Sequence, residues 1–247
     1  MMLLVDAGNT RVKWALADAA CAPGAWRDHG AVLHAQLDEA AAAWKAGGVT
    51  RALVSNVAGP RLAERIAALL PAGIAVEWFA STAQRAGLRN GYREPARLGC
   101  DRFAAAIGAR ALAPGQDLIV ATCGTATTVD AVSADGVFVG GMILPGLALM
   151  ASSLASNTAQ LPQVAAGALP ALFGDNTNDA ILSGVLSAQA GAIERAVAGH
   201  GASACIVSGG AAPYIAPALK VAHTVVDNIV LVGLQTAAFY IEGEARC

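Results

Sequence analysis

Two short segments, one in each half of the chain, share a pattern that limits the possible folds. Residues 3–5 form an apolar run that ends in a polar turn at residues 6–10, and a second apolar run follows at residues 12–16. Residues 118–121 likewise lead into a Gly-Thr turn and continue as a β-branched run. Each pattern predicts a strand, a tight turn and a second strand. Two such hairpins in one chain favour a fold of two similar domains that face each other across a ligand.

The first turn carries side chains suited to a metal ion and to phosphate groups. Asp6 stands at the end of the predicted strand, where a carboxylate can hold a hydrated Mg²⁺. Gly8, Asn9 and Thr10 offer backbone amides, a side-chain amide and a hydroxyl to phosphate oxygens, and Lys13 adds a positive point charge. An ordinary hairpin, in which the Asn-Thr pair only closes an Asx-type turn, explains this segment equally well.

Two further segments favour the phosphate-binding interpretation. Gly124, Thr125 and Thr127 belong to the turn of the second hairpin, which again offers amides and hydroxyls. Gly209 and Gly210 follow an apolar strand and precede a predicted helix, so the backbone there can approach a flat ligand closely. A Ser-Gly-Gly turn is by itself more often a plain strand-to-helix connection. Together and in this order, the three segments predict a nucleotide site to which each domain contributes one phosphate-binding loop.

The motifs, in this order, resemble those of the superfamily that contains actin, hexokinase and the heat-shock chaperones. Within that superfamily, four motifs resemble the type III pantothenate kinases: Asp-x-Gly-Asn-Thr at residues 6–10, Gly-Cys-Asp-Arg at 99–102, Gly-Thr-Ala-Thr-Thr-Val-Asp at 124–130 and Gly-Met-Ile-Leu-Pro-Gly at 141–146. The resemblance extends from residue 2 to about residue 239. The first motif alone indicates only the superfamily, whereas the four together are specific.

The resemblance implies an α/β fold with two similar domains of the ribonuclease H-like, actin-like ATPase type. Each domain has a mixed sheet flanked by helices, and the nucleotide lies in the cleft between the domains. We place the N-terminal domain at residues 1–112 and the C-terminal domain at residues 113–247. The hydrophobic periodicity predicts strands near residues 2–7, 11–17, 26–33, 51–56, 74–78, 117–122, 126–132, 136–141 and 204–208, helices near 35–46, 60–70, 100–112, 147–156, 177–198, 211–219 and 228–241, and loops at 85–97 and 157–175.

The resemblance also implies a reaction: ATP-dependent phosphorylation of pantothenate at its terminal hydroxyl to give 4′-phosphopantothenate, the first step of coenzyme A biosynthesis. ATP, Mg²⁺ and a monovalent cation, K⁺ or NH₄⁺, are the implied cofactors, and a homodimer is the implied assembly. Two alternatives remain open: another small-molecule kinase of the same superfamily, and a regulatory homologue without turnover. The Gly-Cys-Asp-Arg run preceded by Tyr92 in so short a chain disfavours the first, and the retention of Asp6, Lys13 and Asp101 disfavours the second.

Asp101 is the predicted catalytic base. A kinase that acts on an alcohol needs a group within hydrogen-bond reach of the hydroxyl to accept its proton as the phosphoryl group arrives. Asp101 stands in the first turn of the helix predicted at residues 100–112, where the helix dipole stabilises a carboxylate. From spacing alone, a simple helix cap is the more common role of such an aspartate, and the resemblance reverses that order. An ordinary aspartate is a weak base, so we expect Asp101 to accept the proton late.

Five residues form the substrate site that the resemblance implies: Tyr92, Gly99, Cys100, Arg102 and Thr177. Pantothenate is an anion with hydroxyl groups, so a phenol, a guanidinium and a threonine hydroxyl suit it chemically. Arg102 adjoins the base and can hold a carboxylate through two hydrogen bonds, whereas the other arginines between residues 85 and 97 are expected to be solvated. Thr177 precedes a long predicted helix within an Asn-Thr-Asn-Asp run, so it suits a helix cap equally well.

One position departs from the family pattern. The second phosphate motif of the family has an aspartate two residues before its glycine, associated with a monovalent cation, and here that position is Thr122. A hydroxyl is a neutral and weaker cation ligand than a carboxylate. We therefore expect weaker cation binding at Thr122, while ATP binding by Thr125 and Thr127 persists.

The composition excludes several classes of function. Of the 247 residues, 55% are hydrophobic and 14% charged, which is typical of a compact globular protein. The net charge of −2 gives no basic surface for nucleic acid. The five cysteines are dispersed, so we expect reduced thiols in the cytoplasm and no structural zinc. The N-terminal apolar run is short, and the longest apolar stretch, residues 137–151, is interrupted by glycine and proline, so we expect neither a secretory signal nor a membrane span.

The longest predicted helix, at residues 177–198, carries an apolar stripe made of Ile181, Val185, Gln189, Ile193 and Val197. Such a stripe suits a dimer interface. It suits equally well a helix that packs on the sheet of its own domain, and the pattern does not separate these two interpretations.

Overall fold

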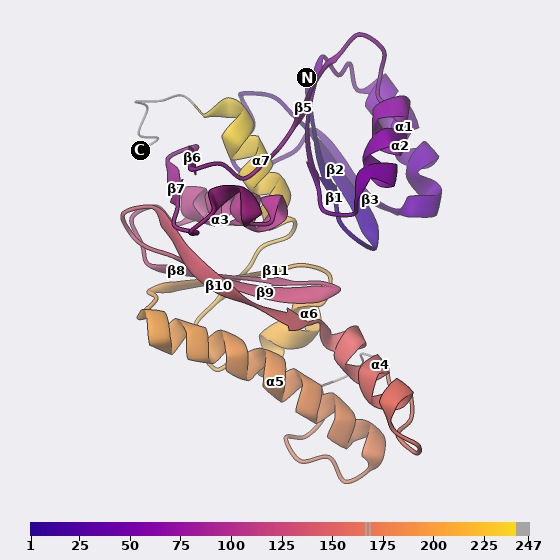
Figure 1. Ribbon diagram of the computed structural model, residues 1–247, viewed down its shortest axis with the longest axis vertical. Coiled ribbons are helices and arrows are strands. Elements are labelled where there is room, and N and C mark those ends of the chain that lie inside the picture. Colours follow the sequence, from indigo (N-terminus) through magenta and orange to yellow (C-terminus); the bar gives the residue numbers. More distant parts are fainter. Residues whose placement is uncertain (166, 168, 241–247) are drawn as a thin grey trace. The chain divides into compact units, whose positions relative to one another are not determined.

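The computed structural model describes residues 1–165, 167 and 169–240 (Figure 1). The chain divides by its contacts into two compact units, and each is described here by itself. The first comprises Met1–Pro114, Gly136–Phe138 and the segment from Asn228 onward, and the second comprises Gly115–Asp135 and Val139–Asp227. The boundary predicted between residues 112 and 113 lies close to Gly115, but a single boundary does not describe the two later segments that return to the first unit.

The first unit contains a five-stranded mixed sheet with the strand order β3-β2-β1-β4-β5. Its strands are β1 (Met2–Ala7), β2 (Arg11–Ala17), β3 (Asp28–Leu33), β4 (Arg51–Asn56) and β5 (Ala75–Trp78). β1 pairs antiparallel with β2 and parallel with β4, so the chain leaves the sheet after β3 and re-enters it beside β1. The five strands predicted for this part of the sequence are confirmed.

Two helices, α1 (Leu37–Ala46) and α2 (Pro60–Leu69), cover one face of this sheet (Figure 1). A 3₁₀ turn, η1 (His34–Gln36), leads into α1. Alternate strand residues, among them Leu3 and Val5, point toward these helices and pack in one buried cluster with Trp44 and Ile66. Full burial of one such side chain contributes about 1.5–3 kcal/mol, so this layer is a main source of the unit's stability.

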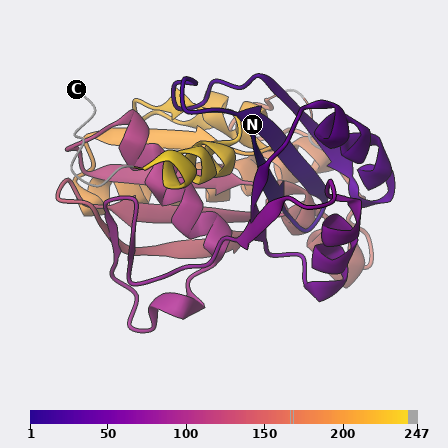
Figure 2. The same ribbon diagram turned by 90° about the horizontal axis from the view of Figure 1, so that it is seen from above.

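On the other side of the same sheet, α3 (Cys100–Leu112) and α7 (Ile229–Phe239) lie next to each other (Figure 1 and Figure 2). The two backbones approach closely because the contact is built on glycine: a Cβ atom on Gly108 would lie 2.7 Å from the carbonyl oxygen of Ile229, and one on Gly233 would collide with that of Ala104. Gln235 of α7 also accepts the N–H of Gly24 at 2.8 Å. These contacts explain why α7 belongs to the first unit although it is distant in sequence.

The segment predicted as a loop at residues 85–97 contains a small hairpin. β6 (Gln84–Arg85) pairs antiparallel with β7 (Leu88–Asn90), and β7 pairs in parallel with the first residues of β10 (Val137–Pro145). A 3₁₀ turn, η2 (Pro95–Arg97), follows. The loop prediction is wrong for these residues because strands of two or three residues are too short to produce a periodic sequence signal.

The second unit is built on strands in the order β12-β11-β8-β9-β10. Besides β10, these are β8 (Leu118–Cys123), β9 (Ala126–Val132), β11 (Ala204–Ser208) and β12 (Thr224–Val225). β8 and β9 form the predicted antiparallel hairpin, and β8 pairs in parallel with β11. The predicted strands are confirmed, whereas the short β12 was not predicted.

Helices α4 (Leu147–Asn157), α5 (Thr177–His200) and α6 (Ala212–Ile215) accompany this sheet, with a 3₁₀ turn, η3 (Ala216–Ala218), after α6. α5 runs along one face of the sheet (Figure 1), where Val185 and Ile193 pack against Ile119 and Val207. Val185 and Ile193 of the stripe therefore cover the sheet of their own unit, and Ile181 packs against Ala151 and Val164. The stripe is occupied within its unit, so the dimer-interface interpretation of this stripe is wrong. None of the helices in the described ranges is long and apolar enough to cross a membrane.

Candidate functional site

The turn between β1 and β2 holds the first predicted phosphate site. Asp6 and Lys13 lie directly opposite each other in the register of the two strands. The N–H of Gly8 donates across the turn to a carbonyl oxygen at 3.1 Å, and Asn9 and Thr10 at the tip are exposed. The hairpin thus places one carboxylate and one lysine behind an accessible turn.

Asp101 belongs to the same electrostatic cluster within the first unit. Burial raises the pKa of Asp6 to about 6; the positive charge of Lys13 acts against this rise, and the negative charge of Asp101 adds to it. Burial also raises the pKa of Asp101, and the N–H of Arg102 opposes that shift by donating to Asp101 Oδ1 at 2.8 Å. The first unit therefore brings the predicted base together with the predicted metal and phosphate residues.

Asp101 is the second residue of α3, and the helix cap is Gly99, which makes no side-chain capping bond. The N-cap position therefore belongs to Gly99, but the Asp101 carboxylate still accepts the N–H of Arg102 in the first turn, so the structure leaves both the capping and the catalytic interpretation of Asp101 open. Cys100 attaches the same turn of the helix to β4, because its Sγ lies 3.4 Å from Ser55 Oγ and donates to the carbonyl oxygen of Asn56 at 3.6 Å. The thiol of Cys100 points toward β4. The substrate contact predicted for Cys100 would therefore have to come from its backbone atoms.

Arg102 and Tyr92 form a direct pair. The Arg102 guanidinium donates to the hydroxyl of Tyr92 at 2.8 Å, and Arg102 as a whole is only 6% exposed. Its Cζ also lies 5.6 Å from the ring centres of both Tyr92 and Phe138, within the range of a cation–π contact. Sequence reasoning missed Phe138, because a single aromatic residue at the start of a strand carries no signal of a distant partner.

The turn between β8 and β9 holds the second predicted phosphate site. Gly124 and Thr125 are exposed, and the N–H of Gly124 donates to the carbonyl of Ala126 at 3.0 Å. Thr127 differs from its prediction: it is fully buried and pairs in register with Cys123, a member of the cluster that packs beneath α5. Its hydroxyl is inaccessible to a phosphate, so Thr125 supplies the accessible hydroxyl of this turn.

Gly209 packs the turn after β11 against the end of β8, next to the Gly124 turn. Its φ of +97° is a left-handed conformation, and a Cβ atom there would collide with the carbonyl oxygen of Cys123. The N–H of Ala211 donates to that same carbonyl at 2.9 Å. Gly210 is exposed and a Cβ atom there would meet nothing, whereas Gly209 is half-buried against the strand that leads to the Gly124 turn; the predicted contact of this pair with a ligand stays a prediction.

Thr122 is part of a row of hydroxyls across three strands of the second unit. In the strand register it faces Thr128 on β9 and Ser208 on β11. Within the described residues, the buried Oγ1 atoms of Thr122 and Thr128 have no hydrogen-bond partner. A buried hydroxyl without a hydrogen-bond partner is unfavourable unless a water molecule or a ligand supplies the bond. This row of hydroxyls can therefore bind a small polar ligand or a water molecule.

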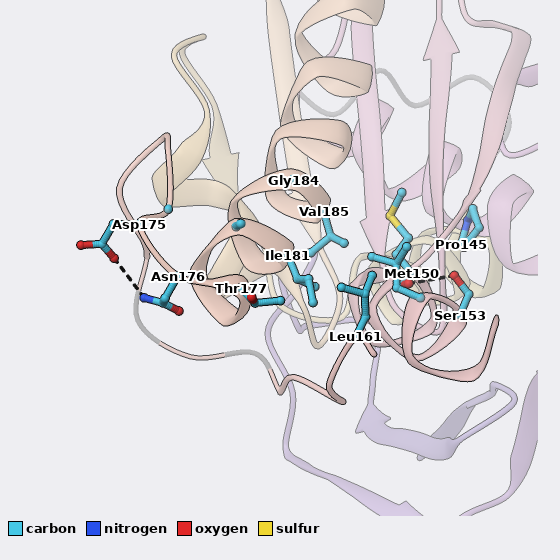
Figure 3. Close-up of a pocket in the computed structure, with 13 residues that line it drawn as sticks. Pro145, Met150, Ser153, Leu161, Asp175, Asn176, Thr177, Ile181, Gly184 and Val185 are labelled. Carbon is cyan, nitrogen blue, oxygen red and sulfur yellow. Dashed lines mark hydrogen bonds between the residues drawn. The ribbon is translucent and has the colours of Figure 1, made fainter. Parts of the chain in front are cut away.

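Thr177 belongs to the second unit, whereas Tyr92, Gly99, Cys100 and Arg102 belong to the first. It lines a pocket of about 820 Å³ in which residues of α5 stand opposite Met150 and Ser153 of α4 (Figure 3). The cap of α5 is Asn176, whose Oδ1 accepts the N–H of Asp179 at 3.1 Å. Thr177 is therefore not the cap. It is the first residue of α5 and is exposed to solvent.

No group of three or more His, Cys, Asp or Glu side chains suited to a metal ion occurs in the part of the chain that the structure describes. A lone carboxylate such as Asp6 suits a magnesium ion that keeps most of its water and is shared with substrate phosphates.

Comparison with known proteins identifies the family. A sequence model of the type III pantothenate kinases matches residues 2–199. A type III pantothenate kinase of Herminiimonas arsenicoxydans is 57% identical over 97% of this chain and 98% of its own length. One from Janthinobacterium sp. (strain Marseille) is 56% identical over 96% and 97%.

Solved structures agree on the fold. The activator of the 2-hydroxyisocaproyl-CoA dehydratase from Clostridium difficile, with bound ADPNP, has a TM-score of 0.55 at 13% identity and covers 97% of this chain and 93% of its own. The ethanolamine utilization protein EutJ from Carboxydothermus hydrogenoformans has a TM-score of 0.57 at 14% identity, with 97% and 89% covered. The predicted α/β, actin-like ATPase fold class is confirmed. With the family motifs in their expected order and close relatives over nearly the whole length, the chain belongs to the type III pantothenate kinase family.

Proposed function

We propose that the protein transfers the γ-phosphoryl group of ATP to the terminal hydroxyl of pantothenate and forms 4′-phosphopantothenate, the first step of coenzyme A biosynthesis. The observation that carries this proposal is that Asp101 has two kinds of neighbour within the first unit. It interacts electrostatically with Asp6, which precedes the β1–β2 turn, and it adjoins Arg102, which pairs with Tyr92. A base between a metal-and-phosphate turn and an anion-binding pair suits phosphorylation of an anionic alcohol.

Pantothenate recognition is assigned to the Arg102–Tyr92 pair and the backbone at Gly99 and Cys100. The guanidinium can bind the carboxylate, and the Tyr92 hydroxyl, which already accepts from Arg102 at 2.8 Å, can donate its own proton to a substrate oxygen. Within the second unit, Thr177 offers an exposed hydroxyl to a substrate.

Asp101 is assigned as the proton acceptor. The hydroxyl oxygen of pantothenate forms a bond to the γ-phosphorus, the bond from that phosphorus to the bridging oxygen of ADP breaks, and the hydroxyl proton passes to an Asp101 oxygen. Because burial raises the pKa of Asp101, its carboxylate is a stronger base than that of an exposed aspartate.

In the first unit, phosphate contacts are assigned to Gly8, Asn9 and Thr10 of the β1–β2 turn and to Lys13 on β2. In the second unit, the residues assigned to phosphate contacts are Gly124, Thr125, Gly209 and Gly210. Thr127, with its buried hydroxyl, supports the second turn from within. Asp6 is the residue that would hold a hydrated Mg²⁺, which would supply positive charge to the ATP phosphates.

A coupled assay with ATP and pantothenate tests the proposal. We expect ADP release that requires pantothenate and a phosphorylated product of matching mass. Hexoses and glycerol serve as control acceptors, because other kinases with this fold act on sugars. ADP release that does not depend on pantothenate, or that a control acceptor supports equally well, would refute the proposed substrate.

Thr122→Asp is expected to lower the K⁺ or NH₄⁺ concentration that gives half-maximal activity. The present Thr122 offers a neutral hydroxyl within a row that lacks hydrogen-bond partners at two of its oxygens, and a carboxylate would add charge for the cation. The measurement is a KCl titration of both proteins at constant ionic strength. Indistinguishable titration curves would show that this position does not contact the cation.

The protein is expected to be a homodimer, as the resemblance implies. The stripe of α5 is occupied within its own unit, so the support for a dimer interface comes from other apolar residues. The exposed fractions are 52% for Val139 and 65% for Ile143, both on β10, and 88% for Phe173. Exposed apolar residues in such number favour a covered interface. Light scattering at micromolar concentration checks the mass, and a monomer would contradict the assembly.

We also propose a cytoplasmic location, supported by the absence of a disulfide among the described cysteines, Cys21, Cys100, Cys123 and Cys205. Cell fractionation with an antibody against the chain tests this assignment.

A further inference from the structure

We propose that Phe138 is a positioning residue that holds the Arg102–Tyr92 pair in its pantothenate-binding arrangement and thereby sets affinity for the acceptor but not for ATP. This inference rests on the proposed function. Phe138 lies far in sequence from both partners, in the three-residue segment Gly136–Phe138 that packs with the first unit.

The contacts of Phe138 form a closed triangle. Its ring meets that of Tyr92 edge-on, with 5.7 Å between the ring centres and 68° between the planes. The Cζ of Arg102 lies 5.6 Å from the centre of each ring. The guanidinium then closes the triangle through its 2.8 Å hydrogen bond to the Tyr92 hydroxyl. Phe138 is fully buried, so it supports the pair from within and leaves the polar atoms to meet a ligand.

The backbone fixes the ring in this place. Phe138 pairs with Asn90 in the parallel β7–β10 register, and its carbonyl accepts the N–H of Gly91 at 2.9 Å. The next residue along is Tyr92, whose N–H donates to Asn90 Oδ1 at 3.1 Å. The Nδ2 of the buried Asn90 donates to the carbonyl oxygens of Thr82 and Pro95 at 3.2 and 3.1 Å. The strand pairing therefore places the Tyr92 loop and the Phe138 ring against each other.

α3 holds the same two segments at its other end. The guanidinium of Arg110 donates to the carbonyl oxygen of Gly87 in the β6–β7 turn. A Cβ atom on Gly136 would lie 2.5 Å from Arg110 Cζ, so the guanidinium also packs against the start of the Phe138 segment. Since Asp101 and Arg102 lie in the first turn of α3, this helix, the β7 segment and Phe138 together support the acceptor site. The phosphate turn between β1 and β2 is not part of it.

Phe138→Leu and Phe138→Met test the inference, since both keep apolar volume and remove the aromatic ring. Without the ring the guanidinium loses one cation–π contact, and we expect the KM for pantothenate to rise about five- to twenty-fold. The KM for ATP should stay within about twofold. Calorimetric titration of the protein with pantothenate in the absence of ATP should show a rise in Kd of the same size.

Trp44→Leu is the control for the loss of a buried aromatic ring. Trp44 is fully buried in the first unit, in the cluster that α1 and α2 form with the sheet on the face opposite to α3. Its Tm should fall as in the Phe138 variants while the KM for pantothenate stays unchanged.

A double-mutant cycle with Tyr92→Phe separates positioning from plain stability. If Phe138 acts through the pair, its effect on pantothenate KM should shrink at least twofold once the Tyr92 hydroxyl is gone. Fully multiplicative effects would overturn the inference, as would a pantothenate KM within twofold of the wild type in both Phe138 variants, or equal rises for pantothenate and ATP. These outcomes require an active wild-type protein; an inactive one would refute the proposed function and this inference with it.

Discussion

Asp101→Asn is expected to lower kcat by about 100-fold or more, the range for removing a positioned base. Asparagine has the shape of aspartate but cannot take the hydroxyl proton. Its side-chain oxygen can still accept the N–H of Arg102, which now donates to Oδ1 at 2.8 Å, so the first turn of α3 should persist. Steady-state kinetics measures the effect, and calorimetry with ATP checks that nucleotide binding survives.

Asp38→Asn serves as the matched control, because Asp38 is an exposed carboxylate whose partner is the surface residue Arg65 at 2.6 Å. Exposed pairs of this kind contribute little, so this variant should retain both its kcat and its Tm. Near-normal turnover in a folded Asp101→Asn protein would remove Asp101 from the mechanism.

Asp6→Asn is expected to weaken the use of MgATP by about 10- to 100-fold, the range for one charge-assisted interaction, while pantothenate binding persists. The ionised carboxylate is the form that attracts a hydrated Mg²⁺. Since burial raises its pKa to about 6, kcat/KM for ATP in the wild type should fall as the pH drops through that value. Separate calorimetric titrations with ATP and pantothenate distinguish the two sites, and loss of pantothenate binding alone would contradict the assignment.

The same substitution should stabilise the ligand-free protein at neutral pH. Below pH 3.8 both folded and unfolded states keep the Asp6 proton; between pH 3.8 and about 6 only the folded state keeps it, so stability falls with rising pH. A shift of this size destabilises the fold by about 3 kcal/mol above pH 6. Asp6→Asn removes that penalty, so its Tm at pH 8 should exceed the wild-type value and the difference should shrink toward pH 4.

Lys13→Ala gives the opposite pattern and serves as the comparison. It should also weaken ATP use, but Lys13 lowers the pKa of Asp6, so its removal leaves the buried carboxylate less compensated and should lower Tm at pH 8. A Tm of Lys13→Ala that equals the wild-type value at pH 8 would contradict this coupling between Asp6 and Lys13.

The sequence by itself determined the features that depend on neighbours along the chain. The hairpin around Asp6 and the hairpin around Gly124 were predictable because in each an apolar run ends in small polar turn residues and a second strand-type run follows. The helix that carries Asp101 in its first turn was predictable from its periodicity. The resemblance of four ordered motifs then indicated the family, which the relatives confirm.

Only the tertiary structure decided what depends on contacts between distant segments. The strand pairing that places Phe138 against Tyr92 joins residues more than forty positions apart through strands too short to give a signal. The burial of Thr127 depends on which sheet face α5 covers, and the use of the α5 stripe depends on the same packing. The shifted pKa of Asp6 depends on burial and on two charges from other segments. Local propensity carries no information about such partners, because burial and pairing become defined only when the chain has folded.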